Sequence, residues 1–390
     1  MAAPRDKPYR VYRGGRAKGK VPLSGRDGKA GSGRSDGGTA PRPPRRRWTW
    51  KRVLLVAVPA LLVLLLIWSL AGYLSVRSGV AAAHKRLPAG TTSALTPGNG
   101  LILDSPTNIL LLGTDHATNG QAGRSSDQHS DSMMLLRTDP KRHRLVYLSI
   151  PRDLRATIPG YGDQKINAAM QIGGPKLAIQ TVQQFTGLPI DHVVVVDFGS
   201  FQKLIDAIGG ITVNIPENIL SNRFDCPYST QARCDQWPGW RFQKGVHHLS
   251  GHEALIYSRV RENRLNPADT DISRGGHQQQ VMQAALNKLA SVSTFFHLPF
   301  DGSSLLAPIA TDLSTWDFMQ LGWVKFRAGS TLHCRLGGTS ADIGGGSYIV
   351  GTQENISVIQ EVLGNSAPQP PSPGGGQYAP GCVTGSQQFR

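Results

Sequence analysis

The sequence predicts the α/β fold class, with a three-layer α/β/α sandwich behind one N-terminal transmembrane helix. Three observations lead to this prediction. Residues 53–74 are apolar and uncharged, short apolar runs ending in Gly, Pro or polar residues recur after Thr107, and segments with helical periodicity alternate with those runs. Such runs are typical of strands buried on both faces, and the helices between them cover both sides of the sheet.

The predicted span, residues 53–74, has 22 residues without a charge, which is enough to cross about 30 Å of hydrocarbon. Pro59 lies near its start, where a membrane helix tolerates proline. A signal peptide cleaved near Val80-Ala-Ala-Ala is the alternative, but the apolar run exceeds the usual core of about 7–15 residues. We therefore expect a retained membrane helix.

The basic charge of the chain is concentrated in its N-terminal tail. Residues 1–52 contain sixteen Lys or Arg and three Asp, which accounts for +13 of the net charge of +16. The tail is rich in Gly, Pro and Ser, has no apolar period and is expected to be disordered. Because no nucleic-acid-binding motif accompanies it, we expect membrane lipid and no nucleic acid as its partner. The positive-inside rule places it in the cytoplasm and residues 75–390 outside the cell.

The exterior part alternates between strand and helix patterns. Apolar runs predict strands at 108–113, 132–137, 145–150, 192–197 and 211–215. Helical periodicity predicts helices at 168–185, 199–208, 271–291, 315–326 and 354–363. A further helix is expected after Ser250, which has the capping-box spacing with Glu253.

These elements suggest a division of the chain into six segments. They are the disordered tail (1–52), the span (53–74), a stalk (75–104), a catalytic domain (105–295), an extension of that domain (296–365) and a Pro/Gly/Ser-rich tail (366–390). All four cysteines fall in the predicted exterior, where disulfides persist. No CxxC pair or histidine spacing supports zinc, so their proximity in the sequence and their context favour disulfides Cys226–Cys234 and Cys334–Cys382.

Charged residues stand where three predicted strands begin or end. Asp115 follows the first strand, Asp131 precedes the second, and Arg152 follows the third. Functional groups of α/β sheets collect at strand ends. Taken alone, an aspartate at such a position is more often a turn or capping residue, and Arg152 is explained equally well as an ion-pair partner of Asp153.

Two later segments add further side chains to this set. Arg259 and Arg261 are two residues apart and would diverge on a helix, so we expect the chain to leave helix there. The alternative is a solvated basic patch paired with Glu262. Arg274 and Gln278 share one side of a predicted helix, and a surface salt-bridge lattice is the alternative there.

Carboxylate oxygens suit Mg²⁺, and guanidinium groups suit phosphate oxygens, so the combined set predicts a pyrophosphate site. The Gly-x-Ser-x-Gly, P-loop and His-Glu-x-x-His signatures are absent from the sequence. Attack on a pyrophosphate needs positioning and cationic stabilisation more than a covalent nucleophile. The general base stays open between Asp131 and Asp153.

Residues 107–291 resemble the LytR-CpsA-Psr family of cell-wall glycopolymer ligases. Seven motifs occur in the family's order: Asn108-Ile-Leu-Leu-Leu-Gly-Thr-Asp, Ser130-Asp-Ser-Met, Ser149-Ile-Pro-Arg-Asp, Lys165-Ile-Asn-Ala-Ala, Gly209-Gly-Ile-Thr-Val, Leu249-Ser-Gly-His-Glu-Ala-Leu-Ile-Tyr-Ser-Arg-Val-Arg and Asp271-Ile-Ser-Arg-Gly-Gly-His-Gln. The resemblance implies an α/β/α sandwich with an apolar channel for a polyprenyl chain. It also implies a transferase that moves a glycopolymer phosphate from a polyprenyl-pyrophosphate carrier to peptidoglycan. Teichoic acid, capsule and arabinogalactan all fit as the glycopolymer.

The resemblance also assigns roles to individual residues. It implies Mg²⁺ at Asp115 and Asp131, and pyrophosphate contacts from Arg152, Arg259, Arg261, Arg274 and Gln278; Asp131, Arg152 and Arg274 are the expected catalytic residues. Two alternatives remain, a non-catalytic polyprenyl-phosphate-binding regulatory ectodomain and a polyprenyl-pyrophosphate pyrophosphatase. The chain departs from the family at His129 and His277, where arginine is frequent, and a phosphate contact from histidine would be weaker and pH-sensitive.

Overall fold

The computed structural model describes residues 50–385 apart from 97, 99, 115–129, 267–270, 290 and 374–377. The chain divides into a unit of residues 1–56 and a unit of residues 57–390. Helix α1 (Trp50–Arg86) begins in the first unit and makes up the start of the second. Among the described residues it is the one helix long and apolar enough to cross a membrane. It continues twelve residues past the predicted end of the span, so residues 75–86 of the expected stalk are helical.

One seven-stranded mixed sheet forms the centre of the second unit, in the order β11-β6-β1-β2-β3-β12-β15. Its strands are β1 (Thr107–Thr114), β2 (Ser130–Asp139), β3 (Arg144–Ile150), β6 (His192–Asp197), β11 (Ile309–Thr311), β12 (Ser330–Arg335) and β15 (Gly381–Thr384). Strands β1, β3, β6 and β12 run in one direction, and β2, β11 and β15 run against them. The carboxyl ends of β1, β3, β6 and β12 therefore meet at one edge of the sheet.

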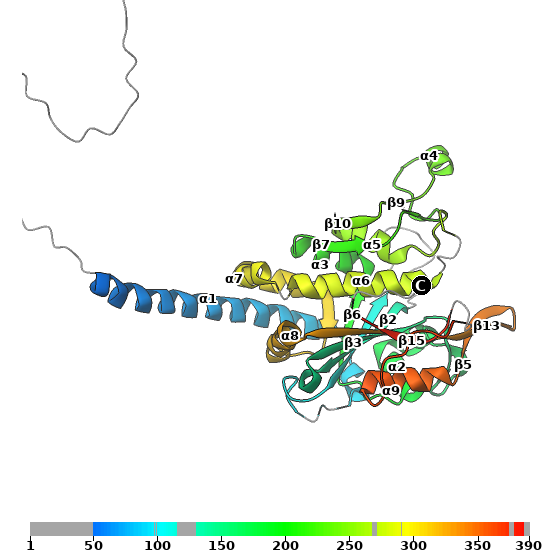
Figure 1. Cartoon of the computed structure of the whole chain (residues 1–390), viewed down its shortest axis with the longest axis horizontal. Coiled ribbons are helices and arrows are strands. Elements are labelled where there is room, and N and C mark those ends of the chain that lie inside the picture. The colour runs from blue at the N-terminus through cyan, green and yellow to red at the C-terminus, as the bar shows by residue number, and fades with distance from the viewer. Residues whose placement is uncertain are drawn as a thin grey trace, which may run out of the picture. The chain divides into compact units, whose positions relative to one another are not determined.

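Helices cover both faces of this sheet, as Figure 1 shows. On one face Leu110, Leu135 and Leu148 pack in a core with α2 (Ala168–Thr186) and α9 (Glu354–Leu363). On the other face Ile109 and Met134 pack in a core with α6 (Asp271–Leu289) and α8 (Thr315–Arg327). Successive side chains of a strand point to opposite faces, so each central strand contributes to both cores. The predicted three-layer α/β/α sandwich is confirmed.

Helix α6 is apolar on two sides and carries a second cluster on its outer face. Met282 and Leu286 lie against the sheet, whereas Val281 and Ala285 lie in a separate core. That core contains α3 (Phe198–Ala207), β7 (Ile211–Ile215), β10 (Gly245–Leu249), α5 (Gly251–Arg259) and part of α7 (Val292–Leu306). The helix is thus held in place from both sides.

The remaining elements lie in loops and small hairpins. They are η1 (Thr91–Ala94), η2 (Pro140–Arg142), β4 (Arg155–Ile158), β5 (Gly162–Lys165), β8 (Ile219–Leu220), α4 (Gln231–Gln236), β9 (Arg241–Phe242), β13 (Gly338–Ile343) and β14 (Gly346–Gly351). The predicted capping box is present at the start of α5, between Ser250 and Glu253. Helix α7 was not predicted, because Pro299 and Gly302 read as helix breakers.

Both predicted disulfides are present. Cys226 and Cys234 have Cα atoms 5.7 Å apart, and those of Cys334 and Cys382 are 4.1 Å apart. The second pair joins β12 to β15 at residues that face each other in the sheet. Residues beyond the predicted catalytic domain therefore supply three of the seven strands, and part of the Pro/Gly/Ser-rich tail is a strand at the sheet edge.

Candidate functional site

The edge where the parallel strands end brings the predicted residues of β1 and β2 together. Thr114, the last residue of β1, pairs with Ser130, whereas Gly113 pairs with Ser132. Asp131 is therefore the extra residue of a β-bulge, a feature that often re-aims a side chain beside a functional site. The side chain of Asp131 and the whole of Asp115 lie outside the described residues, although Asp115 directly follows Thr114.

Arg152 belongs to the same edge. The pairing of β2 with β3 ends at Met133 and Ile150, so Asp131 and Arg152 each lie two residues beyond that last pair. The Nε atom of Arg152 donates to Oδ2 of Asp153 at 3.3 Å. The structure thus shows the ion pair that the sequence left as an alternative, at the same edge of the sheet as the candidate site.

Asp153 is held by two cations. Its Oδ1 accepts a hydrogen bond from Nζ of Lys165 at 2.8 Å, in addition to the contact with Arg152. Burial alone would raise the pKa of Asp153, but the hydrogen bond from Lys165 and the two positive charges outweigh it and hold that pKa below its usual value. A carboxylate stabilised in its charged form is a weak base, so the structure disfavours Asp153 as the general base.

Two side-chain contacts hold helix α6 against this edge of the sheet. Oγ of Ser132 donates to Oε1 of Gln278 at 3.1 Å, and Nε2 of Gln279 donates to the carbonyl of Cys334 at 3.0 Å. Arg274 is one helical turn before Gln278 and is only 8% exposed. Such burial contradicts the alternative of a surface salt-bridge lattice. The contacts bring Gln278 to the strand edge that carries Asp131 and Arg152, and Arg274 is buried one helical turn before it.

The segment with Arg259 and Arg261 contacts helix α6 at His277. Helix α5 ends at Arg259 and Val260 is its C-cap, as the two-residue spacing predicted. Arg259 forms an ion pair with Asp225 and its guanidinium carbon lies 5.6 Å from the centre of the Phe224 ring. Arg261 is exposed. Arg259 is therefore engaged with the loop after β8.

His277 on helix α6 holds the segment that follows α5. It is 5% exposed, lies with its ring centre 4.4 Å from that of Tyr257, and forms a hydrogen bond with the backbone of Val260. Burial lowers the pKa of His277 to about 4, against weaker opposing effects of Glu217 and Val260. The imidazole is therefore neutral near pH 7 and packs inside the protein against Tyr257, which disfavours the expected pH-sensitive phosphate contact of His277. His129 lies outside the described residues.

We expect His277 to make the protein less stable in acid. In the unfolded chain His277 binds a proton with the ordinary pKa near 6.5, whereas in the folded chain it does so only near pH 4. The free energy of unfolding is therefore unaffected by this group above pH 6.5 and decreases as the pH falls from 6.5 toward 4. The loss amounts to roughly 3 kcal/mol at most. Thermal unfolding of the detergent-solubilised protein at pH 7.5 and pH 5 measures it. In His277→Gln the decrease between the two pH values should be smaller, and an equal decrease in both proteins would contradict the prediction.

The sequence did not single out three residues that organise this site. Ser132 positions Gln278, Lys165 neutralises Asp153, and Asp225 pairs with Arg259. Ser132 and Lys165 lie inside motifs that carry the family resemblance, so their proximity to the charged residues was a usable signal. Asp225 lies in a loop with no such signal.

The two aspartates expected to bind Mg²⁺ form a donor set whose chemistry suits that ion. Among the described residues, no group of three or more His, Cys, Asp or Glu side chains gathers to hold a metal ion. Asp115 and Asp131 are hard oxygen donors, and Mg²⁺ is commonly bound by one or two carboxylates together with substrate phosphates. The backbone brings Thr114, the neighbour of Asp115, opposite the segment that contains Asp131.

Known proteins share this motif order and fold. The LytR_cpsA_psr family profile matches residues 72–364. The chain belongs to the LytR-CpsA-Psr family. It is 35% identical over 249 residues to the "Polyisoprenyl-teichoic acid–peptidoglycan teichoic acid transferase TagV" of Bacillus subtilis strain 168, covering 62% of this chain and 59% of the relative. It is 32% identical over 221 residues to the "Regulatory protein MsrR" of Staphylococcus aureus strain Mu50, covering 56% and 60%.

A solved structure of a family member has the same architecture. The LytR-CPS2A-psr family protein YwtF (TagT) with bound octaprenyl pyrophosphate lipid superposes with a TM-score of 0.50 at 25% identity, over 69% of this chain and 92% of that one. The match to the two sequence relatives spans less than two thirds of their own length. The family and the fold are thereby established for this chain.

Proposed function

We propose that this LytR-CpsA-Psr protein is a membrane-anchored transferase that moves a glycopolymer phosphate from a polyprenyl-pyrophosphate carrier to peptidoglycan. The observation that carries the proposal is the burial of Arg274 one helical turn before Gln278, whose side chain contacts Ser132 at the strand edge that also bears Asp131 and Arg152. The name of the TagV relative and the octaprenyl pyrophosphate bound to the related TagT support it. Teichoic acid is the glycopolymer that the relative's name favours.

The arrangement suits phosphoryl transfer from such a carrier. When an acceptor hydroxyl attacks phosphorus, negative charge spreads over the equatorial oxygens, and the bond to the polyprenyl phosphate breaks. Guanidinium groups in a site of low exposure stabilise that charge best, because water does not screen them. Arg274 and Arg152 bind and orient the pyrophosphate, and Gln278 donates a further hydrogen bond through its amide. Mg²⁺ held by Asp115 and Asp131 supplies additional positive charge when bound.

The anchor matches the substrate, since a polyprenyl carrier stays in the bilayer. Helix α1 is apolar over the length needed for a span, and most of the positive charge precedes it. The positive-inside rule then places the N-terminus in the cytoplasm and the catalytic domain outside, where peptidoglycan lies. Sequence and helix together support this orientation.

Transfer in vitro tests the proposal. The full chain in detergent micelles is mixed with a labelled polyprenyl-pyrophosphoryl glycan and peptidoglycan, with and without Mg²⁺. We expect label on peptidoglycan and free polyprenyl phosphate. Release of labelled glycan phosphate together with polyprenyl phosphate in the absence of peptidoglycan, with water in place of the acceptor, would instead identify a pyrophosphatase.

A regulatory lipid-binding ectodomain is the second candidate. The name of the MsrR relative favours it, and so does the neutral His277, which removes one cation where the family often has arginine. Saturable binding of the labelled lipid without transfer, at any Mg²⁺ concentration, would identify this function and overturn the first.

A further inference from the structure

Helix α7 lies beside the C-terminal half of α1, between Trp68 and Gly79. Ring centres of Phe296 and Phe300 lie 6.1 and 5.6 Å from that of Trp68, and the backbone N–H of Ser303 donates to Oγ of Ser75 at 3.1 Å. Further along, a Cβ placed on Gly79 would approach Leu306 within 3.0 Å. Residue numbers rise together along both helices, so α7 runs parallel to α1 (Figure 1).

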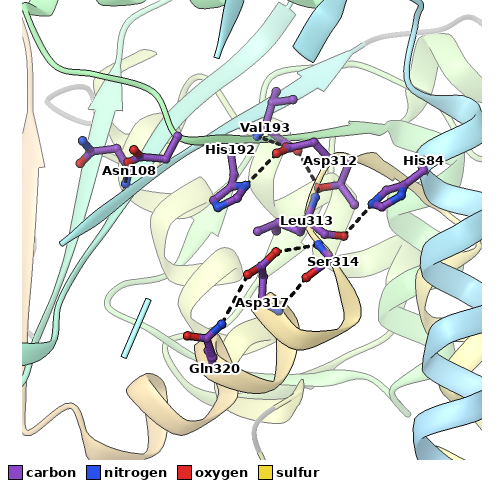
Figure 2. A network of polar contacts seen from close by, with 11 residues as sticks. His84, Asn108, His192, Val193, Asp312, Leu313, Ser314, Asp317 and Gln320 are labelled. Atoms are coloured by element: carbon purple, nitrogen blue, oxygen red, sulfur yellow. Dashed lines mark hydrogen bonds and ion pairs between the residues drawn. The ribbon is translucent and has the colours of Figure 1, made fainter. Parts of the chain in front are cut away.

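The end of α1 is fixed to the domain as well. Nε2 of His84 lies 2.9 Å from the carbonyl oxygen of Leu313, and Arg86 donates to the carbonyls of Leu306 and Ile309. Figure 2 shows how this loop is held, with Asp312 accepting from Nδ1 of His192 at 2.7 Å. The last turn of α1 is therefore docked on residues that follow directly on α7.

Sequence and helix geometry set the depth of this contact. The uncharged stretch from Val53 to Val76 is 24 residues long, which at 1.5 Å per residue is about 36 Å and exceeds a bilayer core of about 30 Å. Arg77 is the first charge after it, so the hydrocarbon ends near Val76. Trp68 lies nine residues before Arg77, about 13 Å deeper along the helix. Phe296 and Phe300 contact Trp68 and share its depth.

The free face of α7 is suited to such a position. Phe296 is 52% exposed and Phe300 is 70% exposed, and the sequence of α7 contains no Lys or Arg. The polar side chains next to the two aromatic residues, His297 and Asp301, are 65% and 45% exposed and lie 3.6 Å from each other, and such pairing lowers the cost of placing polar groups near hydrocarbon. Exposed aromatic side chains next to a membrane span are unfavourable in water and favourable at the bilayer.

We propose that α7 is a lipid-contacting helix that inserts Phe296 and Phe300 into the leaflet nearest the domain, beside α1. The occupant of this face is the hydrocarbon of the bilayer that α1 spans. The inference rests on the membrane anchoring set out in the proposed function. Because α7 follows α6 directly in the chain, it attaches the helix that carries Arg274 and Gln278 to the bilayer that delivers the lipid substrate.

A single fluorescent probe tests this contact. The described cysteines are all in disulfides, so an added thiol is labelled selectively. The full chain carrying Phe300→Cys is labelled with an environment-sensitive dye and reconstituted in phosphatidylcholine vesicles. Leu64→Cys on α1, 63% exposed, is the control for the span, and Tyr161→Cys, 56% exposed in the turn between β4 and β5, is the matched control on the domain.

We expect doxyl groups on the lipid tails to quench the probes at 64 and 300 severalfold more than the probe at 161, and aqueous iodide to quench only the probe at 161. If lipid quenches position 64 but not position 300, the inference fails and the anchoring stands. If neither position is quenched, both fail. A probe at 300 shielded from both quenchers, with cross-linking between two copies, would assign this face to a second chain and overturn the proposal.

Discussion

Replacing Arg274 with alanine should reduce transfer from the lipid-linked donor by about 10²–10³-fold, the usual effect of removing one preorganised donor to transition-state charge. Arg274 is 8% exposed, so water cannot replace its charge effectively. Arg274→Lys should retain part of the rate, because it keeps the charge and loses the planar fork. Initial rates of labelled transfer at saturating Mg²⁺ measure both effects.

The matched control is Arg155→Ala. Arg155 is 40% exposed and pairs with Asp163 in the β4–β5 hairpin, where an exposed ion pair contributes little to stability. This variant should transfer as fast as the parent. If Arg274→Ala unfolds at the parent's temperature and transfers at the parent's rate, Arg274 does not contact the pyrophosphate. If it fails to fold, the rate of Arg274→Lys decides the question.

Removal of divalent metal should abolish transfer, and Mg²⁺ should restore it. Asp131→Asn should raise the Mg²⁺ concentration for half-maximal rate by about tenfold or more, since one of two hard anionic ligands becomes neutral. A titration of the transfer rate with Mg²⁺ after treatment with a chelator gives this value for each protein. The expectation rests on the position of Asp131 at the bulge of β2, next to the segment that pairs with Thr114.

Asp163→Asn controls for the loss of a carboxylate elsewhere, because Asp163 is 46% exposed in the β4–β5 hairpin. Its Mg²⁺ dependence should match that of the parent. Equal rates and equal Mg²⁺ dependence for parent and Asp131→Asn would show that Asp131 is not a metal ligand. Full transfer in the presence of a chelator would exclude the metal from the reaction.

Much of the fold could be predicted from local patterns. The strands at 108–113 and 192–197 are apolar runs with no helical period; β1 is largely buried, and the partly buried β6 packs Val193 and Val194 in the two cores. Ser250 and Glu253 predicted the start of α5 because a capping box depends on residues three apart. Helix α7 was missed because Pro299 and Gly302 oppose helix formation locally, while packing against α1 and α3 stabilises it.

The sequence could predict which residues belong to the candidate site, but not which contacts they make. Arg152 was predicted from its position at the end of a strand, and Arg274 from its position on one side of a helix. The pairing of Arg259 with Asp225 joins residues 34 positions apart, and no local pattern encodes it. The same is true of Asp153, whose pKa is lowered by Lys165 from the neighbouring hairpin.

By itself the sequence predicted the apolar span, five of the strands, the helices other than α4 and α7, both disulfides and the family, because each depends on composition, short spacing or motif order. Only the tertiary structure decided that His277 is a neutral internal residue bonded to Val260, and that Arg274 is buried. The reason is that burial and charge state depend on groups from distant segments. A residue's own neighbours in the chain do not fix how much water reaches it.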